Sequence, residues 1–247
     1  MEDNNKLLSA AQDLTVLCER RGVAVFSRFY DAGERAILED SRLFGSDCVF
    51  YGGYEGAERC ILGIFPEWCE PDFSEYPVKA VRISFSYKKK LSHRDYLGSI
   101  MGLGVERNRI GDILVYDDGA VMIVHESIHS YILDSLKKIG SLGVKVKDCE
   151  LQDIEPPEKN VAVVNTVAAS LRIDAVIAAS LNLSRSVAGS LIEKGLVSVN
   201  HRLVENGSRK ADESDLFSVR GYGRFFLSKI GGKTGKDRIH ITIEKFL

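Results

Sequence analysis

The spacing of apolar and polar residues changes along the chain and separates three regions. In the first region, apolar residues recur at helical intervals over residues 6–21, and a second helix is predicted over 31–43. Two short apolar runs between residues 47 and 66 flank a Gly-Gly turn and predict a pair of strands. Prolines then interrupt the pattern as far as Pro77, so we expect a first domain, an α/β unit, over 1–77.

The second region predicts strands and helices in a regular order. The expected elements are a strand, a helix, a two-stranded hairpin, a helix and a strand, at 78–86, 92–104, 111–124, 127–140 and 143–151. Asp118-Gly119 supports the hairpin, because this dipeptide favours tight turns. The order βαββαβ is that of a ferredoxin-like unit, and we extend this domain over 78–168.

The third region predicts two short helices followed by a strand. Ser184 is a favourable N-cap for the second helix, and Gly195 stands where a left-handed residue would end it. The expected buried stripe of that helix is Val187, Ala188, Leu191 and Ile192. This helix-turn-helix-strand pattern opens a third domain over 169–247.

The third domain resembles the S4 RNA-binding domain. The matching positions are Arg172, Asp174, Ser184, Arg185, Ser186, Ile192, Gly195, Val197, Val199, Asn200, Asp215, Val219, Arg220 and Gly221. The number of matches in the right order makes this resemblance specific. It implies that this end of the chain contacts RNA.

Two further motifs extend the resemblance over nearly the whole chain. Together with the S4-like region, GGYEGAER at 52–59 and MGLGVERNRIGDI at 101–113 resemble the YlmH family of S4-domain RNA-binding proteins. That resemblance implies an N-terminal domain, an RRM-like middle domain and a C-terminal S4 domain. The expected fold class is therefore α+β, with a ferredoxin-like centre.

Charge is distributed unevenly along the chain. The net charge is −2, but residues 1–77 carry 7 Lys+Arg against 15 Asp+Glu, whereas residues 171–247 carry 13 against 8. RNA contacts are therefore expected at the basic end. The candidate RNA-binding residues there are Arg172, Ser184, Arg185, Ser186, Asn200, Arg209, Lys210, Arg220 and Arg224.

Arg185 is the central candidate, because it lies just inside a predicted helix N-terminus. Free amides and the helix dipole favour an anion there, and a guanidinium can bind a phosphate bidentately. In the middle domain, Lys88, Lys89 and Lys90 form a second candidate edge with Arg107 and Arg109, for which a solvated loop is an equal alternative. Base stacking on the middle sheet is not expected, because Tyr116 is the only aromatic residue on the candidate strand.

The sequence offers no supported active site. His125 and His129 match H-E-x-x-H, but His125 is predicted to end a strand, so the two imidazoles would not converge on zinc. No nucleotide-binding loop or nucleophile elbow is present. We therefore expect no catalytic residue, no metal and no cofactor. The five cysteines form no C-x-x-C pair, which favours a reducing compartment such as the cytoplasm, and no apolar run has the length of a membrane span.

These observations lead to one functional expectation and two alternatives. We expect a monomeric, non-catalytic protein that binds structured rRNA or tRNA. The YlmH-like and S4-like motifs further imply association with the large ribosomal subunit, especially one still carrying peptidyl-tRNA, in quality control or rescue. The alternatives are an RNA-modifying enzyme, similar to a pseudouridine synthase, with an unrecognised active site, and an adaptor whose acidic N-terminal domain recruits a protein in cell division.

Overall fold

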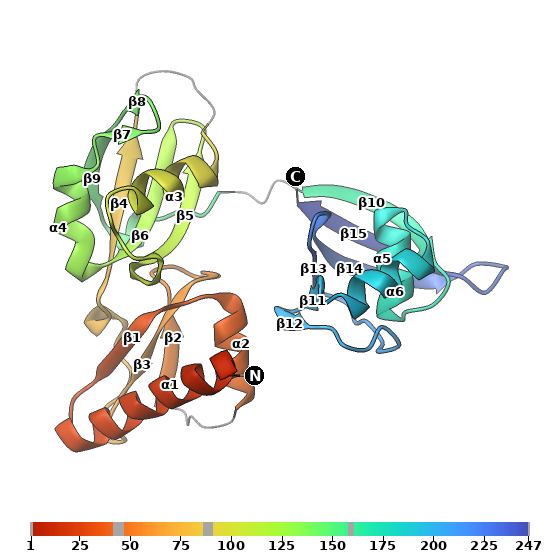
Figure 1. Cartoon of the computed structure of the whole chain (residues 1–247), viewed down its shortest axis with the longest axis horizontal. Coiled ribbons are helices and arrows are strands. Elements are labelled where there is room, and N and C mark those ends of the chain that lie inside the picture. The colour runs from red at the N-terminus through yellow and green to blue at the C-terminus, as the bar shows by residue number, and fades with distance from the viewer. Residues whose placement is uncertain (1, 42–46, 86–90, 158–160, 247) are drawn as a thin grey trace. The chain divides into compact units, whose positions relative to one another are not determined.

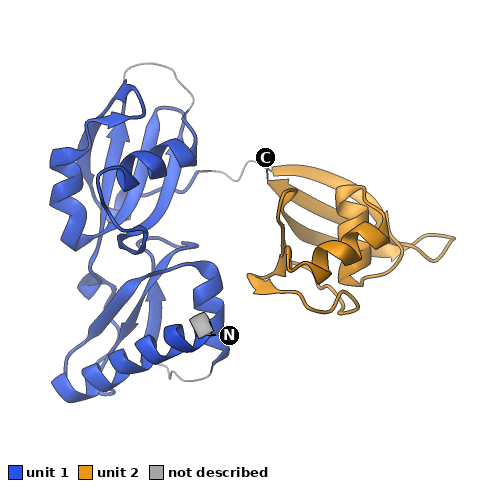
Figure 2. Ribbon diagram, in the orientation of Figure 1, with its two compact units in different colours: residues 1–157 blue, residues 158–247 orange. Residues whose placement is uncertain are grey.

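The computed structural model divides the chain into two compact units, Met1–Pro157 and Glu158–Leu247 (Figure 2). It describes residues 2–41, 47–85, 91–157 and 161–246, with side chains from residue 4 onward. Helices and antiparallel sheets occur in both units, as expected for an α+β protein.

The first half of unit 1 is a three-stranded sheet with two helices. Its elements are α1 (Glu2–Arg21), β1 (Val25–Tyr30), α2 (Ala32–Asp40), β2 (Cys48–Tyr51) and β3 (Cys60–Ile64). The strand order is β1-β3-β2, and both pairs are antiparallel. Strand β1 was not predicted, because its apolar residues lie on both sides of Arg28 without clear alternation. Asp31 starts α2 through a capping box with Glu34.

The second half of unit 1 has the predicted ferredoxin-like order (Figure 1). Its main elements are β4 (Val78–Ser84), α3 (His93–Met101), β5 (Ile110–Tyr116), β6 (Gly119–His125), α4 (Glu126–Ser135) and β9 (Lys145–Cys149). The sheet order β5-β6-β4-β9 is antiparallel throughout. Smaller elements are the hairpin β7 (Lys138–Ile139) and β8 (Leu142–Gly143), and the 3-10 helices η1 (Phe73–Glu75), η2 (Arg107–Arg109) and η3 (Leu151–Asp153).

The two halves of unit 1 share a hydrophobic core. Phe29 of β1 and Ile61 of β3 pack in one cluster with Val121 and Ile123 of β6. All four side chains are almost completely buried. Burial of this shared apolar surface explains why the expected boundary at residue 77 does not separate two compact units.

Unit 2 is a six-stranded antiparallel sheet with two helices packed against it. Its elements are β10 (Val161–Ala168), α5 (Ile173–Leu181), α6 (Arg185–Glu193), β11 (Val197–Val199), β12 (Arg202–Leu203), β13 (Leu216–Val219), β14 (Gly223–Lys233) and β15 (Ile239–Phe246). The strand order is β10-β15-β14-β13-β11-β12. Figure 1 shows α5 and α6 lying over this sheet, and residues of both helices belong to its core.

Strand β10 belongs to unit 2, although the sequence placed it in the middle domain. It pairs with β15 along its whole length, from Val161 opposite Phe246 to Ala168 opposite Ile239. The pairing partner is more than 70 residues away, so no local pattern indicates it. The structural boundary therefore lies near residue 158.

The helix ends in unit 2 follow the predicted capping chemistry. Ser184 accepts a hydrogen bond from the Val187 amide at 3.2 Å, and Gly195 has a positive φ of 66°. The predicted burial of Val187 is wrong, since 42% of it is exposed. The buried residues of α6 are Ala188 and Ile192, and Val187 lies on the exposed side of the helix.

Among the described residues, no single helix is long and apolar enough to cross a membrane. The helices α5 and α6, which meet at 117°, pass that test only when they are taken together.

Candidate nucleic-acid interface

Two arginines at the starts of α5 and α6 share one carboxylate. Arg172 is the N-cap residue of α5, and Arg185 is the first residue of α6. Nη2 of Arg172 donates to Asp174 Oδ2 at 2.8 Å, and Nη2 of Arg185 donates to the same oxygen at 2.9 Å. Asp174 therefore fixes both guanidinium groups beside the helix starts, while much of each side chain stays exposed.

The loop before β13 brings two more cations to the same place. The Ile173 amide donates to the Arg209 carbonyl at 2.9 Å, and Arg172 forms an isolated antiparallel bridge with Lys210. Both Arg209 and Lys210 are exposed, and neither forms an ion pair with any residue that the structure describes. We call Arg172, Arg185, Arg209 and Lys210 the helix-start cluster.

The cluster keeps a positive balance despite its carboxylate. Hydrogen bonds from Arg172 and then Arg185 hold the pKa of Asp174 below its usual value, although burial opposes this shift. Asp174 is therefore ionised at neutral pH, and one negative charge stands among four positive ones. Ser184 uses its hydroxyl to cap α6, whereas Ser186 is exposed on the first turn. The first amides of α6 add donors that favour an anion.

Arg220 and Arg224 lie at the other end of α6. They line an open groove of about 390 Å³ together with residues that follow α6, including Gly195 and Leu196. The Arg220 amide donates to the Leu196 carbonyl at 2.9 Å. The nine residues of α6 span roughly 13 Å at 1.5 Å per residue. The predicted basic residues of unit 2 thus form two regions rather than one.

Arg224 and the aromatic residues around the turn between β13 and β14 differ in their surroundings. The Arg224 guanidinium lies over the Phe246 ring, 5.0 Å from its centroid. Tyr222, in the turn between β13 and β14, is 40% exposed. Phe225 is fully buried and stacks on Phe217, so it is a core residue.

The side chain of Asn200 forms hydrogen bonds within unit 2. Its Nδ2 donates to Asp215 Oδ1 at 2.7 Å, and its Oδ1 accepts from the Leu216 amide at 2.8 Å. Its φ of 50° places it in the left-handed region, which asparagine tolerates better than most residues. The structure therefore gives Asn200 a role in the turn after β11, and its contact with RNA stays a prediction.

The predicted basic edge of the middle region is only partly visible. Lys88, Lys89 and Lys90 lie outside the described residues. Arg107 and Arg109 lie on η2, just before β5. The hydroxyl of Tyr116 donates to the Glu155 carbonyl at 2.7 Å, and the Arg82 guanidinium covers its ring. These contacts agree with the expectation that this strand is not a base-stacking platform.

The H-E-x-x-H histidines are held apart by different partners. His125 ends β6 and caps α4, with its Nδ1 accepting from the Ser127 amide at 3.1 Å. His129 Nε2 lies 2.8 Å from Asp148 Oδ1 on β9. Within the described ranges, no three metal-ligating side chains gather in one place. The prediction that His125 ends a strand is confirmed.

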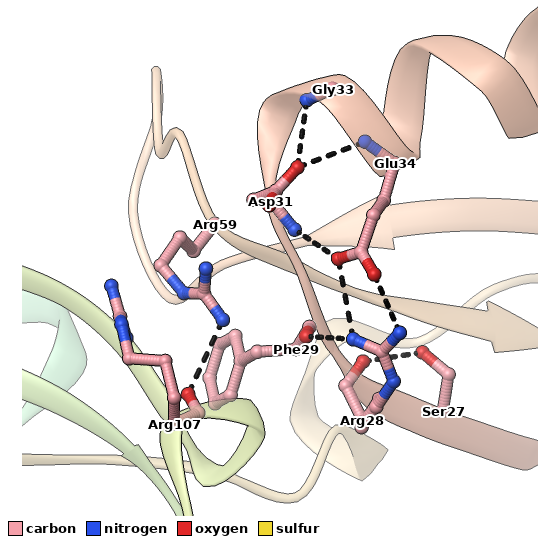
Figure 3. A network of polar contacts seen from close by, with 8 residues as sticks. All are labelled: Ser27, Arg28, Phe29, Asp31, Gly33, Glu34, Arg59 and Arg107. Carbon is pink, nitrogen blue, oxygen red and sulfur yellow. Dashed lines mark hydrogen bonds and ion pairs between the residues drawn. The ribbon is translucent and has the colours of Figure 1, made fainter. Parts of the chain in front are cut away.

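Unit 1 contains a polar site that was not predicted. The Asp112 carboxylate accepts from the Tyr54 hydroxyl at 2.8 Å and from the Glu58 and Arg59 amides at 2.7 and 3.2 Å. Arg59 in turn reaches the backbone of Arg107 (Figure 3). The structure therefore joins the two motifs, 52–59 and 101–113, that resembled one family. In the sequence, the presence of both motifs was the one signal that could have indicated this polar site.

Comparison with known families supports the division of the chain. Residues 71–153 match a family described as a putative RNA-binding domain in YlmH, and residues 171–217 match the S4 domain. The S4 match includes all four residues of the helix-start cluster, and the other match includes η2 and β5.

Two known proteins are similar to this chain. The Ribosome-associated protein quality control protein P2 of Bacillus subtilis is 35% identical over 221 residues, which cover 88% of this chain and 85% of that protein. The solved structure of Cell division protein ylmH from Streptococcus pneumoniae aligns with a TM-score of 0.53 at 24% identity. That alignment covers 62% of this chain and 95% of the other, and it shows a similar fold. On the sequence match and the two domain matches, the chain belongs to the YlmH family of S4-domain RNA-binding proteins.

Proposed function

We propose that this protein binds rRNA and tRNA without catalysis, on a large ribosomal subunit that still carries peptidyl-tRNA. The observation that carries the proposal is the helix-start cluster, in which segments around residues 172, 185 and 209–210 present four cations beside two helix N-termini. Such a surface binds phosphate groups, because cationic side chains and helix N-termini both attract anions.

The relative in Bacillus subtilis supports the ribosomal setting, because its name places it in ribosome-associated protein quality control. The spacing of the cations supports a contact with extended RNA. The helix-start cluster and the Arg220–Arg224 groove lie at opposite ends of α6, so one backbone can touch both. Several weak contacts then add through effective concentration.

Sedimentation of the full chain with purified subunits tests this proposal. We expect co-sedimentation with large subunits, more with those bearing peptidyl-tRNA than with empty ones, and little with small subunits. Replacing Arg209 and Lys210 by Gln removes two exposed cations, and it should lower affinity on the order of tenfold at moderate salt.

The matched control is Lys145→Gln with Lys147→Gln, which removes the same charge from exposed positions on β9. This control should sediment like the wild type. Equal binding to small subunits, or equal loss of binding in both double variants, would contradict the proposal.

A further inference from the structure

Two guanidinium groups in unit 1 converge on a single backbone carbonyl. Arg59 Nε and Arg107 Nη1 each donate to the Ile110 oxygen at 2.8 Å. Arg59 Nη2 also donates to the Arg107 carbonyl at 3.3 Å, as Figure 3 shows. The two cations are thus held close together, although Arg59 lies in the loop before β3 and Arg107 lies on η2.

The surrounding backbone fixes this arrangement. Strand β5 contains a bulge between Ile110 and Ile113, where its register with β6 shifts. Gly111 in the bulge leaves no room for a side chain, because a Cβ would lie 2.9 Å from the Phe29 ring. Asp112 in the same bulge ties down the loop that carries Arg59. Both arginines are therefore positioned before any ligand arrives.

In the part of the chain that the structure describes, neither cation pairs with a carboxylate. Among the described residues, no carboxylate oxygen lies within ion-pair distance of either guanidinium, whereas the neighbouring Arg28 is bidentate with Glu34 (Figure 3). The nearby Asp112 carboxylate is occupied by a hydroxyl and two amides. Only neutral carbonyls therefore receive hydrogen bonds from Arg59 and Arg107.

Like charges that are partly buried together are unfavourable without a counter-ion. Burial lowers the pKa of Arg59, and burial together with the Arg59 charge lowers the pKa of Arg107 to about 10. The charges of Asp31 and Asp112 oppose part of both shifts, but neither carboxylate forms an ion pair with these arginines. Each guanidinium has five N–H donors, and most of them remain without a partner among the described residues. An anion with several acceptor oxygens would satisfy both the charge and these donors.

We propose that Arg59 and Arg107 bind one phosphodiester group of an RNA backbone. This inference rests on the proposed RNA-binding function and adds a contact in unit 1 to those in unit 2. Arg94, which is exposed, lies in the first turn of the helix α3, and Arg109 lies on η2 with Arg107. The positive charge thus continues beyond the pair, as a strand of successive phosphates requires and a lone small anion does not.

The test is the salt dependence of binding of the full chain to bulk tRNA, measured by fluorescence anisotropy. Arg107→Gln and Arg59→Gln should each make the slope of log K against log salt shallower by about 0.7 to 0.9, the value of one lost phosphate contact. Arg107→Lys should keep the slope, because it keeps the charge. Arg82→Gln is the matched control, since Arg82 already pairs with Asp118, and it should leave the slope unchanged.

A second measurement needs no RNA. At constant ionic strength, replacing chloride by inorganic phosphate should raise the Tm of the wild type and of Arg82→Gln, and raise it less in Arg59→Gln and Arg107→Gln. This comparison separates a bound anion from a purely structural clamp, because loss of a clamp lowers the Tm equally in both salts.

The outcomes distinguish this inference from the proposed function. Tight tRNA binding with unchanged slopes in both Gln variants would overturn the phosphodiester site and leave the proposed function standing. A phosphate effect on the Tm with unchanged tRNA slopes would assign the pair to a small phosphate ligand and would also overturn it. Absence of tRNA binding by the wild type would overturn both proposals.

Discussion

The helix-start cluster and the Arg59–Arg107 pair each hold positively charged side chains close together, but they differ in what offsets the repulsion between them. In unit 2, two arginines share Asp174, and the remaining cations are exposed to water, which screens them. In unit 1, two arginines are partly buried against neutral carbonyls, and they share no carboxylate among the residues that the structure describes. The first arrangement is stable without a ligand, whereas the second gains most when an anion arrives. The two regions differ in whether a carboxylate accepts hydrogen bonds from the arginines, and not in the number of arginines.

The largest expected effect separates the two regions by stability. Asp112→Ala leaves the Tyr54 hydroxyl and two amides without an acceptor, so it should destabilise unit 1 by about 2–4 kcal/mol. Unit 2 should be unaffected. Hydrogen exchange read out separately for the two units would measure this difference. Asp118→Ala, which breaks one exposed ion pair, should change stability by less than about 1 kcal/mol. A similar loss in both variants would show that the Asp112 contacts contribute little.

Asn200 and Arg185 sharpen the distinction between fold and RNA contact inside unit 2. Asn200→Ala should destabilise unit 2 by about 1–2 kcal/mol, because it removes two hydrogen bonds and places alanine at a positive φ. It should leave the salt slope of tRNA binding unchanged. Arg185→Gln should show the opposite pattern, with little change in stability and a slope shallower by about 0.7 to 0.9. A shallower slope in Asn200→Ala would instead support the predicted RNA contact of that residue.

Asp174→Asn tests whether the shared carboxylate limits the positive field of the helix-start cluster. Removing one negative charge should increase retention on heparin and raise affinity for bulk tRNA by about two- to fivefold at low salt. The same change should lower the stability of unit 2 by about 1 kcal/mol, since both arginines lose their partner. Weaker tRNA binding would instead mean that Asp174 acts mainly by orienting the arginines.

The smallest expected effect is the pH dependence of that contact. Arg172 and Arg185 lower the pKa of Asp174 in the folded chain from a usual value near 3.8. A carboxyl with a lowered folded pKa stabilises the fold above the unfolded pKa, and this stabilisation is lost as the pH falls through the folded value. The difference in Tm between wild type and Asp174→Asn should therefore be constant near neutral pH and shrink below about pH 4. A difference that shrinks well above pH 5 would contradict the lowered pKa.

The sequence by itself determined the local elements and the contiguous site. The βαββαβ order and the caps at Ser184 and Gly195 depend on spacing and residue type within short windows, and the structure agrees with them. The basic residues near the starts of α5 and α6 were predicted for the same reason. Their positions follow from two consecutive helices joined by a short turn.

Only the tertiary structure decided the long-range contacts. The pairing of β10 with β15, the core shared by the two halves of unit 1, and the meeting of Arg59 with the Arg107 carbonyl, 48 residues away, leave no periodic trace. The hydrogen bond from the Leu216 amide to Asn200 and the hydrogen bonds from two arginines to Asp174 also became clear only from distances. A side chain's type shows what it can bind, but packing brings its partner within reach and sets which of its donors and acceptors are already used.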